Sequence, residues 1–385
     1  MLDNISLILT ISLIVIFSPF FAKLLKIPTT PIEIVFGAVA GYVGFVHPQQ
    51  LFEIVSKFGF LYLMFIAGTE IDLKKVLKTP ARMMKRVLFY LLFLYALAFA
   101  FSLYFSYSQI FMALLPLISV GLIATLSKEY GKTSWLSLSM MAGGIGEVAS
   151  IAVLTIMSAT LKFGVGMGLL QTLLALVLFV IFMLVLFRFL QLLFWWFPEV
   201  SVALMPHDDN KEQDIRLSMG IFFILLAMML YLDLELAFGA FLAGIFIPTF
   251  FEHKHELPQK LGSYGFGFLI PIFFIHIGSV FNLDALFIDG LVMEALIITL
   301  IMTSIRVMSS LVFIKEYGLK NSVLMGLSHS MPLSLLIAMA TLAYDSKGID
   351  EFHYFALILA ALFQVLIIMT LIKIVNMRFK DKVTA

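Results

Sequence analysis

Apolar residues fill this chain in long runs, separated by short segments that carry most of the charges, prolines and glycines. Two of these runs, Leu88 to Phe105 and Leu169 to Phe187, approach the roughly 20 apolar residues that a helix needs to cross a bilayer. Together the runs exceed what one globular core could bury. The pattern predicts an all-α polytopic membrane protein with about 13 transmembrane helices. Their approximate bounds are 4–25, 31–47, 51–69, 85–106, 109–127, 135–161, 166–193, 215–233, 235–250, 262–280, 289–314, 319–343 and 352–376.

Composition removes the soluble alternatives. Of the 385 residues, 62% are hydrophobic and 13% are charged, against roughly 45–50% and 25% in soluble proteins, which excludes a water-soluble enzyme. The absence of cysteine excludes disulfides, thiolate metal sites and a cysteine nucleophile. The 25 basic residues nearly match the 24 acidic ones in number. The sequence therefore lacks the excess of positive charge that is typical of proteins that bind nucleic acids. Since the sequence also lacks metal-ligand and phosphate-loop spacings, we expect no enzyme activity, no cofactor and no resident metal.

The placement of the basic residues predicts how the helices are oriented, because cytoplasmic loops are enriched in Lys and Arg. Most of the basic residues lie at or after the ends of the odd-numbered helices. Only Lys57, Lys162 and Lys347 fall on the opposite side, and Arg306 is the one basic residue deep inside a predicted span. The N-terminus is therefore expected outside and the C-terminus in the cytoplasm.

Two short segments occur twice along the chain. Ile32–Ala38 is repeated at Leu234–Ala240, an offset of 202, and Gly68–Leu73 is repeated at Gly278–Leu283, an offset of 210. Seven predicted helices separate the copies, and this odd number means that the copies cross the membrane in opposite directions. The sequence thus predicts one transmembrane domain over 1–385, built of inverted repeats at about 4–161 and 215–376 and joined by the helix at 166–193. Chance similarity between apolar segments is the alternative.

Two predicted helices contain residues that interrupt helical structure at equivalent places. Ser119-Val120-Gly121 and Ser328-His329-Ser330-Met331-Pro332 are separated by about 210 residues, similar to the repeat offset. Gly121, Ser330 and Pro332 are the expected breaks, because Gly and Pro weaken the backbone hydrogen-bond ladder. In transporters with inverted repeats, two such discontinuous helices cross near the middle of the membrane and form the binding site. A simple packing kink is the alternative for each segment.

Glu147 is the most informative candidate for chemistry. It lies 12 residues into the predicted span 135–161, flanked by glycines that include Gly146. A carboxylate so far from the membrane surface is costly, and such residues commonly serve ion or proton paths. Arg306 lies 17 residues into the predicted span 289–314, also near the middle of the membrane. It cannot carry protons, so it is expected to act as a fixed counter-charge. A permanent structural ion pair between Glu147 and Arg306 is the alternative.

Other ionisable residues are weaker candidates for a secondary role in ion or proton binding. Glu33 and Glu70 lie at predicted membrane boundaries, where a carboxylate needs no special function. His276 and His329 could titrate near neutrality, but an intramembrane histidine is as often a hydrogen-bonding link between helices.

Four segments give the chain its resemblance to a known family: Ile27 to Gly41, Leu63 to Leu73, Phe238 to Gly244 and Ile270 to Gly278. Over nearly its full length the chain resembles the cation:proton antiporter-2 family, the membrane part of bacterial sodium/proton and potassium/proton exchangers.

The resemblance implies that the protein lies in the lipid bilayer of the bacterial inner membrane and forms a homodimer. It also implies that the transported ions are Na+ or K+ together with H+. It also implies an ion-binding role for the pair at Gly146-Glu147, an opposing basic residue at Arg306, and a polar residue at the first break in Ser119.

The sequence also departs from the family. Relatives carry an Asp-Asp or Asn-Asp pair where this chain has Gly146 and Glu147, so one polar partner of the ion is missing. The chain ends nine residues after the last predicted helix, and we expect no C-terminal regulatory domain.

The favoured function is exchange of Na+ or K+ for H+ by alternating access, with one carboxylate that binds either ion. Because Gly146 adds no second charge and Arg306 keeps its own, we expect electroneutral exchange. Two alternatives are a transport-inactive membrane scaffold or sensor, and an organic-anion carrier or symporter that uses Arg306.

Overall fold

The computed structural model describes residues 2–378 apart from 26–27, 48, 72–78, 132, 165, 198, 201–211, 235, 252–255 and 282. Within these residues every regular element is a helix, which confirms the predicted fold class. Parts of the repeat segments and some of the basic residues behind the predicted orientation lie outside the described residues. These are Lys26, Asp72, Leu73, Lys74, Lys75, Lys78, Lys132, Lys211, Glu235, Lys254, Asn282, Lys380 and Lys382.

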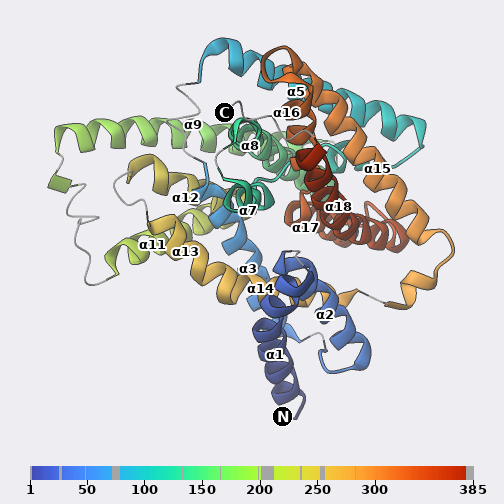
Figure 1. The fold of residues 1–385 in the computed structure, drawn as a ribbon. Coiled ribbons are helices and arrows are strands. Elements are labelled where there is room, and N and C mark those ends of the chain that lie inside the picture. Colours follow the sequence, from blue (N-terminus) through green and yellow to red (C-terminus); the bar gives the residue numbers. More distant parts are fainter. Residues whose placement is uncertain are drawn as a thin grey trace, which may run out of the picture. The chain divides into compact units, whose positions relative to one another are not determined.

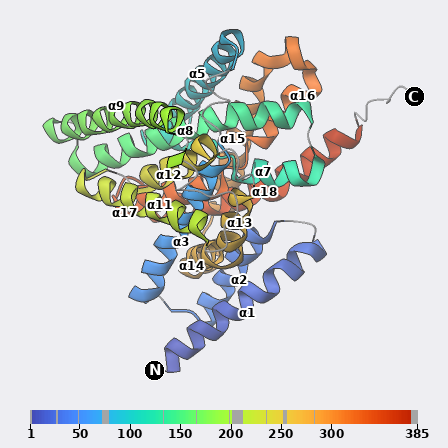
Figure 2. The same ribbon diagram turned by 90° about the vertical axis from the view of Figure 1, so that its left-hand side faces the viewer.

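The chain divides into two compact units. The first contains Met1–His47, Lys78–Leu154 and Ile277–Ala385. Within it α15 packs against α5 and α18, and α1 packs against α2 (Figures 1 and 2). Its helices are α1 (Leu2–Leu25), α2 (Thr29–Val43), α5 (Ala81–Tyr104), α6 (Phe111–Leu114), α7 (Gly121–Tyr130), most of α8 (Ser134–Phe163), α15 (Leu291–Ser310), α16 (Ile314–Ser328), α17 (Leu333–Asp345) and α18 (Glu351–Arg378).

The second unit contains Pro48–Leu77 and Thr155–His276. Here α12 packs against α3 and α11. Its helices are α3 (Gln50–Thr69), α9 (Met167–Trp196), α11 (Gln213–Tyr231), α12 (Leu236–Phe250), α13 (Leu257–Tyr264) and most of α14 (Ile270–Val280), with a π-helical turn at Gly265–Leu269 between α13 and α14.

The observed helices follow the predicted spans closely. The largest differences are five residues, at the starts of the tenth and twelfth spans, which were predicted at 262 and 319 and lie at Leu257 and Ile314. In the twelfth span the backbone of Gly318 is non-helical, with φ 75° and ψ 167°, a conformation that favours glycine. The uninterrupted part of this helix therefore restarts at Leu319, where the apolar pattern placed it.

Length and composition make these helices suited to a membrane. In the described part of the chain, nine helices are long and apolar enough to cross it, and α2, α12 and α17 are shorter apolar helices. Helix α9 is the clearest case, because only Leu176 and Phe179 among its 30 residues are buried. The remaining apolar side chains of α9 suit contact with lipid rather than water.

Close glycine contacts hold two pairs of helices together. In the second unit, a side chain on Gly68 of α3 would collide with the carbonyl oxygen of Phe241 in α12, and one on Gly244 of α12 would collide with that of Phe65. In the first unit, Gly278 of α14 lies in the same way against the carbonyl oxygen of Ile34 in α2. Small residues allow such close approach of helix backbones in membranes.

We expect Gly68→Ala to destabilise the protein by about 1–3 kcal/mol, because the new methyl group must push two helix backbones apart. Thermal unfolding in detergent measures this effect. Gly220→Ala is the matched control, since a methyl group at this position of α11 meets no atom within 4 Å. The control should be neutral or stabilising by about 0.4–1 kcal/mol. Equal melting temperatures for the two variants would show that the α3–α12 contact is not tight.

Candidate functional site

The first predicted helix break is present between α6 and α7. Helix α6 ends at Leu114 and α7 begins at Gly121, and residues 115–120 between them are not helical. Pro116 lies in this stretch and cannot donate a backbone hydrogen bond, which weakens the helical ladder at this point. The stretch is buried, with Ser119 only 4% exposed. Its free N–H and C=O groups therefore need partners inside the protein.

Glu147 and Ser150 of α8 supply partners for the N–H groups of this break. The Ser119 hydroxyl donates to Oε1 of Glu147 at 2.9 Å, and the Val120 N–H donates to Oε2 at 3.1 Å. The Ile118 N–H donates to Oγ of Ser150 at 3.0 Å. Glu147 is fully buried. The structure thus joins the two residues singled out as ion ligands, Glu147 and Ser119, through a direct hydrogen bond.

Gly146 allows this close contact between α8 and the break. A Cβ atom at this position would lie 2.6 Å from Cδ1 of Ile118 and 3.4 Å from Cδ2 of Leu91. Gly146 has no side chain that could bind an ion, although the resemblance placed it at the ion-binding pair. Its observed contact is with the side chain of Ile118 in the break.

Arg306 of α15 also binds the first break. Its side chain is fully buried. One terminal guanidinium nitrogen, Nη2, donates to the carbonyl oxygen of Leu117, and the other, Nη1, donates to that of Met302 at 2.6 Å. Among the described residues Arg306 forms no ion pair, and its Nε has no hydrogen-bond partner. Arg306 therefore shares the break with Glu147 but binds a carbonyl group rather than the carboxylate.

The second predicted break separates α16 from α17. Helix α16 ends at Ser328 and α17 begins at Leu333. Pro332 precedes α17 directly and its carbonyl accepts from the Leu336 N–H at 2.7 Å, so Pro332 starts the new helix. The hydroxyl of Ser330 donates to the carbonyl oxygen of Gly326 at 2.8 Å, and this bond completes the last turn of α16. Both breaks thus occur at the positions that the sequence indicated.

His329 connects the second break to two other helices of the same unit. It is fully buried. Its Nδ1 lies 2.8 Å from the hydroxyl of Tyr90 in α5, and its Nε2 lies 3.0 Å from the carbonyl oxygen of Ser139 in α8. Of the two uses considered for His329, titration and hydrogen bonding between helices, the observed contacts match the second.

The remaining candidates lie on other elements. Glu33 is buried in α2, with 4% of its surface exposed. Glu70 is exposed at the C-terminal cap of α3, and the ring of His276 in α14 lies edge-on to Phe52, with 4.9 Å between ring centroids. In the part of the chain that the structure describes, no group of three His, Cys, Asp or Glu side chains could hold a metal ion.

Several residues that the structure places in or near the site are only weakly marked by local sequence patterns. Ser150 follows Glu147 by three residues on α8, and this helical spacing could have suggested a shared face. Tyr90 and Ser139 meet His329 only through the tertiary fold, and no local pattern identifies them.

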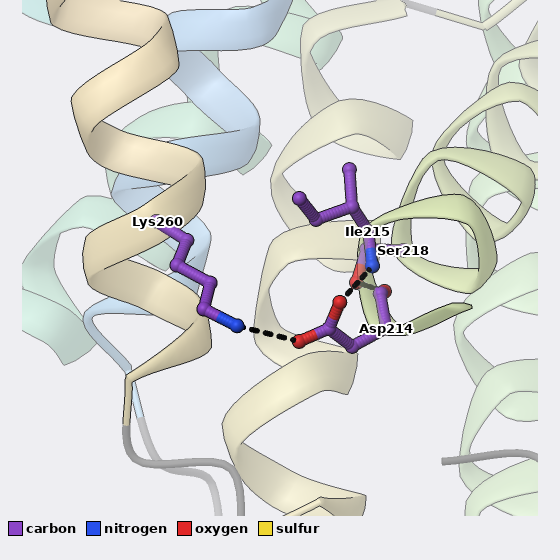
Figure 3. Close-up of polar contacts among 4 residues, drawn as sticks. All are labelled: Asp214, Ile215, Ser218 and Lys260. Atoms are coloured by element: carbon purple, nitrogen blue, oxygen red, sulfur yellow. Dashed lines mark hydrogen bonds and ion pairs between the residues drawn. The ribbon is translucent and has the colours of Figure 1, made fainter. Parts of the chain in front are cut away.

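Asp214 is a buried carboxylate that the apolar pattern did not reveal. It lies in the first turn of α11 and is 1% exposed. Its Oδ1 accepts from the Ile215 N–H at 2.8 Å, its carbonyl oxygen accepts from the Ser218 hydroxyl at 2.7 Å, and its Oδ2 lies 3.4 Å from Nζ of Lys260 in α13 (Figure 3). These contacts join α11 to α13 within the second unit, and they give Asp214 a structural role.

Comparison with known proteins gives consistent matches. The transmembrane sodium/hydrogen exchanger family model matches residues 9–377. YjbQ of Bacillus subtilis is 26% identical over 360 residues, which cover 88% of this chain but 57% of that protein. An Na(+)/H(+) antiporter of Enterococcus hirae is 25% identical over 352 residues, covering 89% of this chain and 90% of that protein.

A solved structure has the same fold. The sodium proton antiporter MjNhaP1 of Methanocaldococcus jannaschii, determined at pH 8, superposes with a TM-score of 0.64 over 98% of this chain and 97% of the other, at 14% sequence identity. The two chains thus share an all-helical fold although their sequences differ widely.

Proposed function

Because this chain belongs to the sodium/hydrogen exchanger family, we propose that it exchanges a monovalent cation, Na+ or K+, for protons across the membrane. The observation that supports this proposal most directly is the contact between Glu147 and the first helix break. A fully buried carboxylate accepts hydrogen bonds from the Ser119 hydroxyl and the Val120 N–H. Buried carboxylates within membrane spans are typical of ion and proton pathways.

Glu147 would bind the proton and the cation in turn. The cation would take oxygen ligands from the Glu147 carboxylate and the Ser119 hydroxyl, because small hard cations prefer such oxygens. A proton on the carboxylate removes the negative charge that the cation needs. The two ions therefore compete for one site, and this competition converts alternating access into exchange.

Arg306 would support this cycle without carrying a proton. Arginine keeps its charge in proteins, and here it donates to the carbonyl oxygen of Leu117 within the break. The fixed positive charge offsets part of the cost of a buried carboxylate. Its two terminal nitrogens are already bound to carbonyl groups, and this arrangement does not favour Arg306 as the binding site of an anionic substrate.

An inverted repeat would relate the two halves of the site. Both breaks lie at similar places in the proposed repeats, after Leu114 and after Ser328. The glycine contacts agree with this relation, because the second helix of the first repeat meets α14 while α12, its counterpart, meets α3. The distribution of basic residues along the chain supports an N-terminus outside and a C-terminus in the cytoplasm.

Exchange by purified protein in liposomes tests the proposed function. We expect a pH gradient across the liposome membrane to dissipate when Na+ or K+ is added, and to persist when choline is added instead. The same assay with each cation also identifies the preferred ion. A gradient that persists with Na+, K+ and Li+ would support a scaffold, and dissipation that depends on an organic anion would support an anion carrier.

We expect this exchange to be insensitive to membrane potential. One proton and one monovalent cation share one carboxylate, so a complete cycle moves no net charge. Movement of one charge would instead couple transport to the potential by roughly 2.3 kcal/mol per 100 mV. Initial rates measured with and without a potential set by valinomycin distinguish the two cases. A marked change in rate would contradict one-for-one exchange.

A further inference from the structure

His329 has a definite hydrogen-bonding state in the second break. The Ser139 carbonyl oxygen can only accept, so the Nε2 atom that lies 3.0 Å from it carries the proton. In a neutral ring Nδ1 is then an acceptor, and the Tyr90 hydroxyl donates to it at 2.8 Å. Both ring nitrogens of this fully buried side chain are satisfied without a net charge.

A second contact connects His329 to the ion site. A Cβ atom on Gly143 of α8 would lie 3.3 Å from Nε2 of His329 and 3.0 Å from Cγ1 of Val120. The side chains of His329 and Val120 therefore meet at the same glycine, one from each helix break. Both side chains lie against the space that the missing side chain of Gly143 leaves on α8.

The spacing along α8 places these contacts on one face of the helix. Ser139, Gly143 and Glu147 follow one another at intervals of four residues, which puts them one above another on the helix surface. The Ser139 carbonyl oxygen binds His329, and the Glu147 carboxylate binds the Val120 N–H. Gly143, between them, lies against the side chains of His329 and Val120. One face of α8 thus contacts both breaks.

We propose that His329 is a positioning residue for the ion site, a role that rests on the proposed exchange function and extends it. The neutral imidazole fixes the second break against α8 and thereby fixes the side chain of Val120 beside Gly143. The Val120 N–H is then directed at Glu147. His329 acts through Val120 and takes no proton or cation itself.

Hydrogen exchange of backbone amides tests this role independently of transport. His329→Leu removes both hydrogen bonds of the ring. We expect the backbone amides of residues 115–121 to exchange at least about tenfold faster than in the wild type. This factor corresponds to the loss of roughly one buried hydrogen bond. Because His329→Leu could fail to fold, Tyr90→Phe is a milder second variant that removes only the donor to Nδ1. We expect a smaller increase in the same peptide.

Tyr62→Phe is the matched control. Tyr62 is buried like Tyr90, and its hydroxyl makes one hydrogen bond, to the carbonyl oxygen of Leu261 at 3.1 Å in the second unit. Amide exchange of residues 115–121 should not change in this variant. If His329→Leu and Tyr90→Phe also leave this peptide at the wild-type rate, the proposed positioning role is wrong.

Transport kinetics provide the second readout. A loosened Val120 weakens cation binding, so the cation concentration for half-maximal exchange should rise about tenfold in His329→Leu. His329→Gln should recover most of the affinity, because its amide can still donate to the Ser139 carbonyl. Equal affinity in the Leu variant and the wild type would overturn the proposal. Lack of exchange by the wild type would instead refute the proposed function, and amide exchange would still decide the role of His329.

Discussion

Glu147→Gln is expected to abolish cation-dependent proton exchange in a protein that still folds. Glutamine can accept a hydrogen bond from the Val120 N–H or the Ser119 hydroxyl, so part of the contact with the break is kept. It can neither take up a proton near neutral pH nor balance the charge of a cation. An unbalanced buried charge costs several kcal/mol, so we expect exchange to fall at least about a hundredfold, since each 1.4 kcal/mol is tenfold.

Exchange in liposomes, together with a melting curve in detergent, checks this result. Glu147→Asp keeps the charge but is one methylene shorter, so it cannot reach both Ser119 and Val120 as Glu147 does, and we expect intermediate activity. Asp214→Asn is the matched control, because it neutralises another buried carboxylate that lies in a structural contact with Lys260. This control should exchange at close to the wild-type rate. Cation-dependent proton release that persists in Glu147→Gln would remove Glu147 from its proposed role.

The sequence predicts the helices well because membrane spans depend on local composition. A run of apolar residues that is long enough to cross the bilayer has few alternatives to a helix. Every predicted span corresponds to observed helical structure. The breaks are local in the same sense. Pro116 and Pro332 lie in the two interruptions. Proline weakens the helical hydrogen-bond ladder, and polar or small residues stand beside both prolines. Ser119 lies in the interrupted helix and Glu147 is the buried carboxylate of α8. The two become neighbours once the interruption is placed beside that carboxylate.

Partners that depend on side-chain direction could not be predicted in this way. Opposite charges suggested that Arg306 faces Glu147, but the guanidinium turns to the carbonyl oxygens of Leu117 and Met302. The unwound backbone creates these acceptors, and a sequence does not show which way a freed carbonyl points. His329 is similar, because its contacts with Tyr90 and Ser139 join positions 239 and 190 residues away in the chain.

The face of α8 explains how few polar residues can serve both breaks. Glu147 and Ser150 satisfy N–H groups of the first break, while the Ser139 carbonyl binds the second break. Gly143 and Gly146 lie between these groups and leave space for the side chains of the breaks. A motion that shifts one break against α8 would therefore change the surroundings of the Glu147 carboxylate. Alternating access requires such a coupling between the position of an element and the state of the ion site.

Arg306→Met is expected to have the second largest effect on exchange. The substitution removes the donor to Leu117, and a buried carbonyl without a partner costs about 1–3 kcal/mol. It also removes the fixed positive charge in the same break, which makes a charged Glu147 more costly. Together these losses should reduce exchange by about a hundredfold, since 2.8 kcal/mol corresponds to two powers of ten. The measurement is cation-dependent proton exchange in liposomes, with melting in detergent as the check on folding.

Arg306→Lys separates the charge from the hydrogen-bond geometry. Lysine keeps the charge as a compact ammonium group but lacks the planar fork that binds two carbonyls at once, so we expect a loss of about tenfold, the cost of roughly one buried hydrogen bond. Arg216→Met is the control, because Arg216 is exposed on α11 in the second unit, and it should exchange normally. If Lys and Met at position 306 are equally inactive, the fork to the Leu117 carbonyl matters more than the charge. If Arg306→Met exchanges at the wild-type rate, neither the charge nor the fork supports the ion site.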